Sequence, residues 1–121
     1  MAVEEGWIPF SQEEVERTLA QGRPAFVDFT AAWCLTCQVN ERVVLSTDRV
    51  QEAFRDRSVA LFKADWTRQD PEITAALEAL GRNGVPVYAL YRGSTDAEPH
   101  LLPAILTEQI VLDALANVLS P

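Results

Sequence analysis

The chain contains, at residues 25–37, the stretch AFVDFTAAWCLTC, in which a short apolar segment leads into two cysteines. Residues 25–30 are mostly apolar and β-prone, a pattern that predicts a buried central strand. Residues 31–33 form a link, and residues 34–45 are predicted to continue as a helix. The strand therefore passes into a helix that begins at a cysteine, and the fold and function of the chain are predicted from this junction.

The remaining elements alternate in the same way. Helices are predicted where a capping residue precedes apolar positions one turn apart, and strands where short β-prone runs lie between turn residues. In chain order they are a helix at 12–21, a helix at 48–55, a strand at 58–65, a helix begun by Asp70-Pro71, a strand at 86–91, a weaker strand at 100–102 and a helix capped by Thr107. This order predicts an α/β fold, a central mixed β-sheet with helices on both faces, formed as a single domain over residues 1–121.

Composition and charge narrow the range of functions. The 121 residues are 48% hydrophobic and 23% charged, which is typical of one globular domain with its own core. The formal net charge of −8 argues against a nucleic-acid partner, because no basic patch is available to neutralise phosphates. The longest apolar runs are far shorter than the ~20 residues that a membrane-spanning helix needs.

The two cysteines, Cys34 and Cys37, are the only ones in the sequence. A structural zinc site normally has four protein ligands, and the only histidine, His100, is distant in sequence, so no metal site is expected. A disulfide between residues three apart closes too small a loop to stabilise a fold much. The pair is therefore interpreted as redox-active, with the disulfide itself in place of any cofactor.

The start of a helix favours a thiolate, because unpaired backbone N–H groups and the helix dipole attract an anion. Cys34 is therefore predicted to attack a partner disulfide, and Cys37, one turn further on, to resolve the mixed disulfide. Trp33 is predicted to form a wall of the site. Leu35 and Thr36, between the cysteines, are further candidates for contact with a substrate.

Asp28 lies in the middle of the predicted buried strand, where a carboxylate is rarely found unless it has a role. We expect it beneath the cysteines, exchanging protons with Cys37 through water. Burial would raise the pKa of Asp28, and its charge would raise the pKa of the thiols. The alternative is an aspartate that points to solvent from an alternating strand.

Glu41 follows Cys37 by four residues and Cys34 by seven, so all three can share one helix face. If Glu41 faces the thiols, it and Asp28 would oppose the helix dipole and keep the attacking cysteine protonated until a partner binds. The alternative is a solvated helix glutamate.

Val85 and Pro86 open the predicted strand at 86–91, a position at which proline is compatible with sheet pairing. A cis bond between them would leave the Val85 backbone free to pair with a substrate strand, as in β-augmentation. The residues alone leave the isomer open, since trans is the default for an X-Pro bond.

These features resemble thioredoxin, and more closely the C-terminal periplasmic domain of the DsbD family of thiol:disulfide interchange proteins, including the membrane reductases tied to copper sensitivity. The segments that carry the resemblance are residues 29–37, Asn40-Glu41, residues 63–67 and Leu106-Thr107. Cytosolic thioredoxins have Gly-Pro where this chain has Leu35-Thr36. Gln38 replaces a lysine often found after the second cysteine, so the local charge can differ.

The resemblance implies a protein-disulfide reductase that acts as an electron relay. It implies that Asp28 and Glu41 modulate the nucleophile, that Pro86 is cis, and that the sequence is a domain excised from a larger membrane protein. In such a protein the domain would be periplasmic and tethered to the inner membrane, a monomer in isolation. It would take electrons from a membrane-embedded donor domain and pass them to a periplasmic thiol protein.

Two alternatives stay open. One is a free-standing general thioredoxin, which would be cytoplasmic. The other is a non-catalytic module that uses both thiols to bind a metal or a partner.

Overall fold

The computed structural model describes residues 6–96 and 98–119, which form one five-stranded sheet with helices. The elements are β1 (Trp7–Pro9), α1 (Gln12–Ala20), β2 (Ala25–Thr30), α2 (Leu35–Asn40), a π-helical segment η1 (Glu41–Leu45), α3 (Asp48–Asp56), β3 (Ala60–Asp65), α4 (Pro71–Ala79), β4 (Val87–Tyr91), β5 (His100–Leu102) and α5 (Glu108–Leu119). Within these residues, no helix is both long and apolar enough to cross a membrane.

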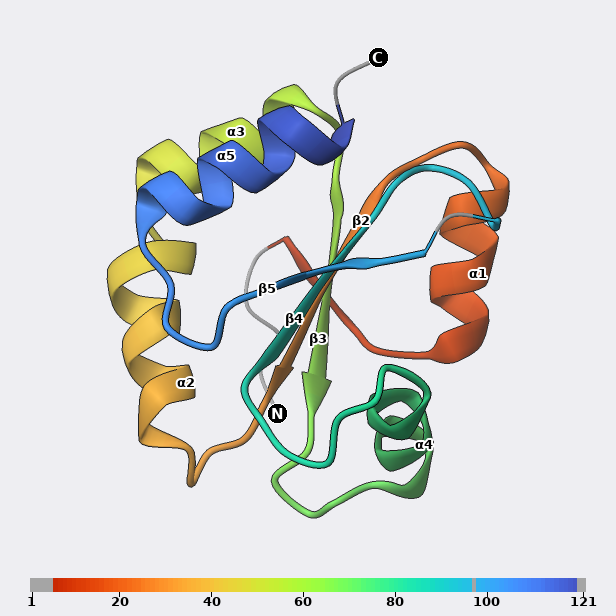
Figure 1. Cartoon of the computed structure of the whole chain (residues 1–121), viewed down its shortest axis with the longest axis vertical. Coiled ribbons are helices and arrows are strands. Elements are labelled where there is room, and N and C mark those ends of the chain that lie inside the picture. The colour runs from red at the N-terminus through yellow and green to blue at the C-terminus, as the bar shows by residue number, and fades with distance from the viewer. Residues whose placement is uncertain (1–5, 97, 120–121) are drawn as a thin grey trace.

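The sheet has the strand order β1-β3-β2-β4-β5, so β2, which leads to the cysteines, is its central strand. β3 pairs with β2 and with β1 in parallel, whereas β4 runs antiparallel to β2, and β5 runs antiparallel to β4. Figure 1 shows α1 and α4 on one side of the sheet and α2, α3 and α5 on the other. The predicted α/β fold with a mixed sheet covered on both faces is confirmed.

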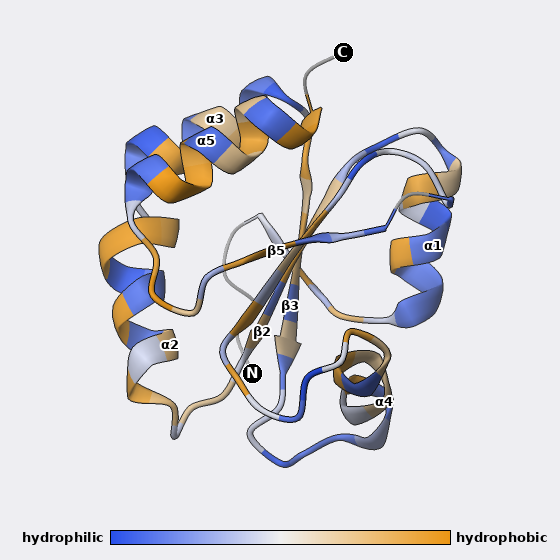
Figure 2. Cartoon of the chain, in the orientation of Figure 1, coloured by the Kyte–Doolittle hydropathy of each residue, from blue (hydrophilic) through white to orange (hydrophobic). Residues whose placement is uncertain are grey.

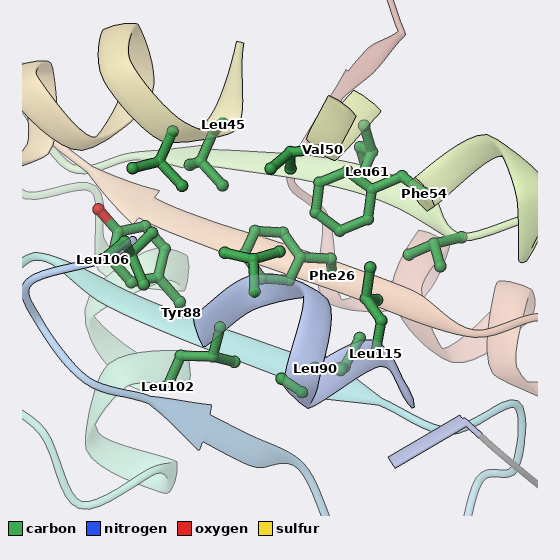
Figure 3. Packing of buried hydrophobic residues seen from close by; sticks show 14 of the residues in the cluster. Phe26, Leu45, Val50, Phe54, Leu61, Tyr88, Leu90, Leu102, Leu106 and Leu115 are labelled. Atoms are coloured by element: carbon green, nitrogen blue, oxygen red, sulfur yellow. The ribbon is translucent and has the colours of Figure 1, made fainter. Parts of the chain in front are cut away.

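Two apolar clusters fill the space on either side of the sheet. One contains Phe26 of β2, with aromatic rings of α3 and β4 packed around it at centroid distances of 5.1 and 6.1 Å (Figure 3). The other contains Val27 and Phe29, which point to the opposite face by the alternation of a strand. Figure 2 shows α1 and α5 with hydrophobic residues turned towards the sheet and hydrophilic residues turned away. The face that holds Phe26 also holds Asp28, two residues further along β2.

One strand, β1, was not predicted, and several predicted boundaries were wrong. β1 has only three residues at a sheet edge, too few to show alternation, although its Trp7 is buried. The strand expected at 58–65 begins at Ala60, because Ser58 has a left-handed φ of 55°. The strand expected from Pro86 begins at Val87, and the helix expected through residue 21 ends at Ala20.

The helix expected at 34–45 is continuous in chain position but changes type. Residues 35–40 are α-helical and residues 41–45 are π-helical, with the Ser46 N–H donating to the Glu41 carbonyl at 2.9 Å. A π turn adds a residue to the turn, which rotates the following side chains relative to an α-helix, and such turns occur frequently at functional sites. The change of helix type begins at Glu41, one of the predicted site residues.

Candidate active site

Cys34 and Cys37 form a disulfide at the end of β2, with Cα atoms 5.3 Å apart. Cys34 is the N-cap residue of α2, and its sulfur accepts a hydrogen bond from the Cys37 N–H at 3.2 Å. Cys34 retains 8% of its surface, whereas Cys37 has none. An N–H directed at the Cys34 sulfur would also stabilise a thiolate there, and the outer position makes Cys34 the more accessible of the two.

The loop that delivers Cys34 is fixed by hydrogen bonds to the segment after β3. The Ala32 N–H donates to the Thr67 hydroxyl at 2.8 Å, and the Trp33 indole N–H donates to the Thr67 carbonyl at 3.0 Å. On the other side, the Gln38 side chain donates to the Ala31 carbonyl at 2.9 Å. The turn between strand and helix is therefore held at both ends, which fixes the position of the first cysteine.

Asp28 is completely buried in β2 on the face that α2 and α3 cover. Its neighbours in register are Lys63 of β3 on one side and Tyr88 of β4 on the other. The alternative in which Asp28 points to solvent is therefore wrong.

Glu41 also points inward, and only 15% of its side chain is exposed. Its Oε1 atom lies 2.9 Å from Nζ of Lys63, the residue in register with Asp28. Lys63 also lies over the ring of Trp7, 5.6 Å from the centroid, so the edge strand β1 helps to hold the ammonium group. The alternative of a solvated Glu41 is therefore wrong, and its ion-pair partner is the residue of β3 in register with Asp28.

Two residues of this region were not predicted as part of the site. Tyr88 is fully buried, and its hydroxyl accepts a hydrogen bond from the Asn40 amide at 2.8 Å. Burial raises the pKa of Tyr88, and the negative charge of Asp28 raises it further. Its hydroxyl therefore stays protonated at any physiological pH. Lys63 carried one sequence signal, since it is the only lysine in the chain.

The predicted substrate-contact residues lie around the disulfide. The Val85-Pro86 bond is cis, as the resemblance implied, and Val85 packs against the cluster of Ala31, Cys34 and Cys37. Leu35 is 78% exposed, although it is a large apolar side chain. Thr36, beside it, is exposed as well.

Trp33 is the most exposed tryptophan of the chain, with 57% of its surface open. Its ring centroid lies 6.1 Å from that of Trp66, a buried residue after β3. It therefore stands beside the first cysteine with one side supported and the other facing solvent. This placement agrees with a wall of the site rather than a core residue.

Metal ligands do not gather in the described part of the chain. No three His, Cys, Asp or Glu side chains there are placed to hold a metal ion together. His100 lies exposed on the edge strand β5, away from the central strand that leads to the cysteines.

The Lys63–Glu41 pair yields a prediction about stability. Lys63→Met is expected to lower the free energy of unfolding by about 2 kcal/mol, because it leaves a largely buried carboxylate without its ion-pair partner. The double variant Lys63→Met/Glu41→Gln should recover at least half of that loss, since the Glu41 charge is then no longer left without a partner. Urea denaturation of the wild type and the two variants measures this, and equal losses in the single and double variants would contradict the role assigned to the pair.

Known proteins resemble this chain both in sequence and in fold. The family described as thioredoxin-like matches residues 6–93. The thiol:disulfide interchange protein DsbD of Salmonella typhimurium is 32% identical over 89 residues, which cover 72% of this chain and 15% of that protein. The oxidised C-terminal domain of DsbD from Neisseria meningitidis has a TM-score of 0.70 at 24% identity, with 88% of this chain and 90% of that one covered. A thioredoxin from Thermus thermophilus has a TM-score of 0.74 at 23% identity, with 92% and 84% covered.

The structural similarities, at these identities, concern the fold. The chain spans only about 15% of the length of the curated DsbD relatives, so the activity of those whole proteins does not transfer directly. The family match, by contrast, covers most of the chain and includes both cysteines, the central strand and the cis-proline. The chain therefore belongs to the thioredoxin-like family.

Proposed function

We propose that this chain is a thiol–disulfide oxidoreductase that reduces a protein disulfide and acts as a relay between two thiol proteins. The single observation that supports this best is the Cys34–Cys37 disulfide, with one sulfur at the surface and the other buried beside it. The exchange needs no cofactor beyond this disulfide.

The reaction starts from the dithiol form. The Cys34 thiolate attacks one sulfur of the partner disulfide, the partner S–S bond breaks, and the released partner sulfur takes up a proton. Cys37 then loses its proton and attacks the Cys34 sulfur, which breaks the mixed disulfide and releases the second partner thiol. Two electrons and two protons move to the partner, and the chain ends as the Cys34–Cys37 disulfide.

The carboxyl groups of Asp28 and Glu41 would slow the first attack, by Cys34, whereas Asp28 would assist the second attack, by Cys37. Asp28 lies on the sheet face covered by the cysteine helix and would accept the Cys37 proton, through water, in the second step. The negative charges of Asp28 and Glu41 would disfavour the Cys34 thiolate before a partner binds. A partner that covers the site would change how strongly these charges disfavour the Cys34 thiolate. Disulfides that do not dock at the site would therefore react slowly.

The relay assignment rests on the similarity to DsbD. We propose that the chain is one domain of a membrane-tethered protein and acts in the periplasm as a monomeric unit. Its electron donor would be a membrane-embedded domain and its acceptor another periplasmic thiol domain. Trp33, Leu35, Thr36, Val85 and Pro86 would provide the surface on which these partners dock.

Substrate preference tests the relay. The reduced chain is mixed with one of three oxidised substrates: insulin, glutathione, or the second periplasmic thiol domain of Salmonella typhimurium DsbD. This second domain is the periplasmic thiol domain of DsbD that the present chain does not match. Second-order rate constants are measured for each substrate. The relay predicts a rate constant at least about 100-fold higher for the DsbD domain than for either general substrate, a difference of roughly 2.7 kcal/mol. Equal rate constants for all three would contradict it and favour a general thioredoxin, the fold of the Thermus thermophilus neighbour.

A further inference from the structure

One threonine after β3 accepts two hydrogen bonds from the turn that carries the first cysteine. β2 and β3 run in parallel, so the turn at residues 31–34 and the segment at residues 65–67 leave the same end of the sheet (Figure 1). Thr67 accepts from the Ala32 N–H through its hydroxyl and from the Trp33 indole N–H through its carbonyl. Thr67 therefore ties the turn to the neighbouring strand.

Asp65, the last residue of β3, holds Thr67 in place. Its Oδ1 atom accepts from the Thr67 N–H at 3.0 Å and also from the Thr67 hydroxyl. An aspartate that bonds the backbone two residues further on closes a local turn, and hydrogen bonds to an ionised acceptor are stronger than neutral ones. The N–H, the hydroxyl and the carbonyl of Thr67 are thus all in use, and the hydroxyl both donates and accepts. A change at Asp65 is therefore expected to reach the active-site turn through Thr67.

Trp66, between these two residues, supports the same turn through its ring. Its centroid lies 6.1 Å from that of Trp33, and its own indole N–H donates to the Thr74 hydroxyl of α4 at 2.8 Å. Residues 65–67 thus provide a carboxylate anchor, an aromatic support and two hydrogen-bond acceptors. Together they fix one side of the turn at residues 31–34.

A protein partner would engage two parts of the site that come from different elements. The Cys34 sulfur lies on the turn after β2, whereas the Val85 backbone, which would pair with a substrate strand, precedes β4. β2 and β4 pair only as far as Phe29 and Val87, so the distance from the sulfur to the Val85 backbone depends on how the turn is held. A misplacement of about 1 Å at a reacting group can slow a reaction by about 100-fold. A small disulfide is not fixed at Val85 and does not depend on this distance.

We propose that Asp65 and Thr67 are positioning residues for the attack of Cys34 on a protein disulfide. Asp65 orients Thr67, and Thr67 holds the turn and Trp33 at a fixed place relative to the sheet. Neither residue is assigned a contact with the partner or a part in proton transfer. This inference rests on the proposed function, because the reaction that it concerns is the reduction of a protein disulfide.

Thr67→Val tests the position of the turn, because valine keeps the shape of threonine and lacks its hydroxyl. Thr67→Ser, which keeps the hydroxyl, is the conservative variant. Thr47→Val is the matched control. The Thr47 hydroxyl also accepts a backbone N–H, that of Val50 at 3.4 Å, and donates to the Val44 carbonyl at 3.0 Å, but it caps α3. The probes are the oxidised second periplasmic thiol domain of Salmonella typhimurium DsbD and oxidised glutathione.

Thr67→Val should lower the rate constant for the DsbD domain at least about tenfold and leave that for glutathione within about twofold. Hydrogen exchange at the Ala32 N–H should become faster, since its acceptor is lost. Thr67→Ser should restore most of the rate and of the protection from exchange, and a loss equal to that in Thr67→Val would refute the part assigned to the hydroxyl. Thr47→Val should change neither measurement, although it loses a helix cap. Selective loss in this control as well would point to general destabilisation and overturn the role of Thr67.

Asp65→Ala tests whether the carboxylate acts through Thr67. It removes the acceptor of both Thr67 bonds, so it should reproduce the selective loss and the faster exchange at the Ala32 N–H. The double variant Asp65→Ala/Thr67→Val should then stay within about twofold of Thr67→Val, because residues that act through one contact are not additive. Additive losses would show that Asp65 acts by another route and would overturn its role.

The outcomes separate this inference from the proposed function. If the wild type reduces the DsbD domain rapidly and Thr67→Val does so equally well, the positioning role is refuted while the relay stands. Equal loss towards glutathione and the domain would also refute it, because the effect would then lie in the thiol chemistry. If the wild type reduces neither probe, the proposed function fails and the inference fails with it.

Discussion

Cys37→Ala is expected to stop the exchange at its midpoint, so that the protein accumulates as a mixed disulfide with its partner. Cys34, at the N-cap of α2, keeps its exposed edge and the hydrogen bond from the backbone N–H of residue 37, neither of which needs the Cys37 side chain. The first attack therefore proceeds. The second attack lacks a nucleophile, and release of reduced partner should fall to the background rate.

The mixed disulfide is detected as a covalent complex on a non-reducing gel and located by mass spectrometry. Cys34→Ala is the matched control, and it should form no complex, because Cys37 is completely buried. A complex that forms through Cys37 in this control would reverse the order of attack assigned here.

Asp28→Asn is expected to have the second-largest effect, and to change the two half-reactions in opposite directions. Asparagine has nearly the same shape but cannot accept a proton, so resolution by Cys37 should slow by about 100-fold, a typical contribution of a general base. The first attack should become easier. Removal of a negative charge favours the thiolate, which lowers the pKa of Cys34 and shifts the rise of the attack rate to lower pH.

Single-turnover kinetics with the DsbD domain separate the two steps, and the ultraviolet absorbance of the thiolate follows the titration of Cys34. Glu41→Gln is the companion variant. It should also lower the pKa of Cys34 but leave the resolution step near its wild-type rate, since Asp28 is retained. Unchanged titration curves in both variants would show that the buried carboxyl groups do not act on the thiols.

The strand at residues 25–30 and its junction with the cysteines were predictable because all the signals there are local. Six residues that are mostly apolar and β-prone, a short link and a helix start lie within one stretch of sequence. β2 has the predicted limits, and Cys34 lies at the predicted helix start. The inward position of Asp28 was favoured and that of Glu41 was left open, since the face that a strand or helix presents to the core depends on what packs against it.

The contacts around the carboxyl groups depend on residues that are far apart in the chain. Lys63 reaches Glu41 only because β3 pairs with β2 in the register that places it beside Asp28. Trp7 contributes through β1, a strand too short to leave a sequence pattern. The π turn that begins at Glu41 has no propensity signal comparable to those of helices and strands.

The contacts of Asn40 could not be predicted from the sequence either. They are hydrogen bonds to residues 48 to 66 positions away, and no local pattern marks them. What the sequence does contain is a polar residue one turn after Cys37, on the buried side of a helix. Such a position identifies a residue that needs partners, and only the fold identifies which partners they are.

The most direct test of thiol–disulfide exchange through this pair is the stoichiometry of transfer to an oxidised protein partner. The reduced chain is mixed with the oxidised second periplasmic thiol domain of Salmonella typhimurium DsbD, the reaction is quenched with an alkylating reagent, and modified cysteines are counted by mass spectrometry. We expect Cys34 and Cys37 to be both alkylated before mixing and both protected afterwards, while the partner gains two alkylated cysteines for each chain oxidised. A partner that stays oxidised while this chain keeps both thiols would contradict it.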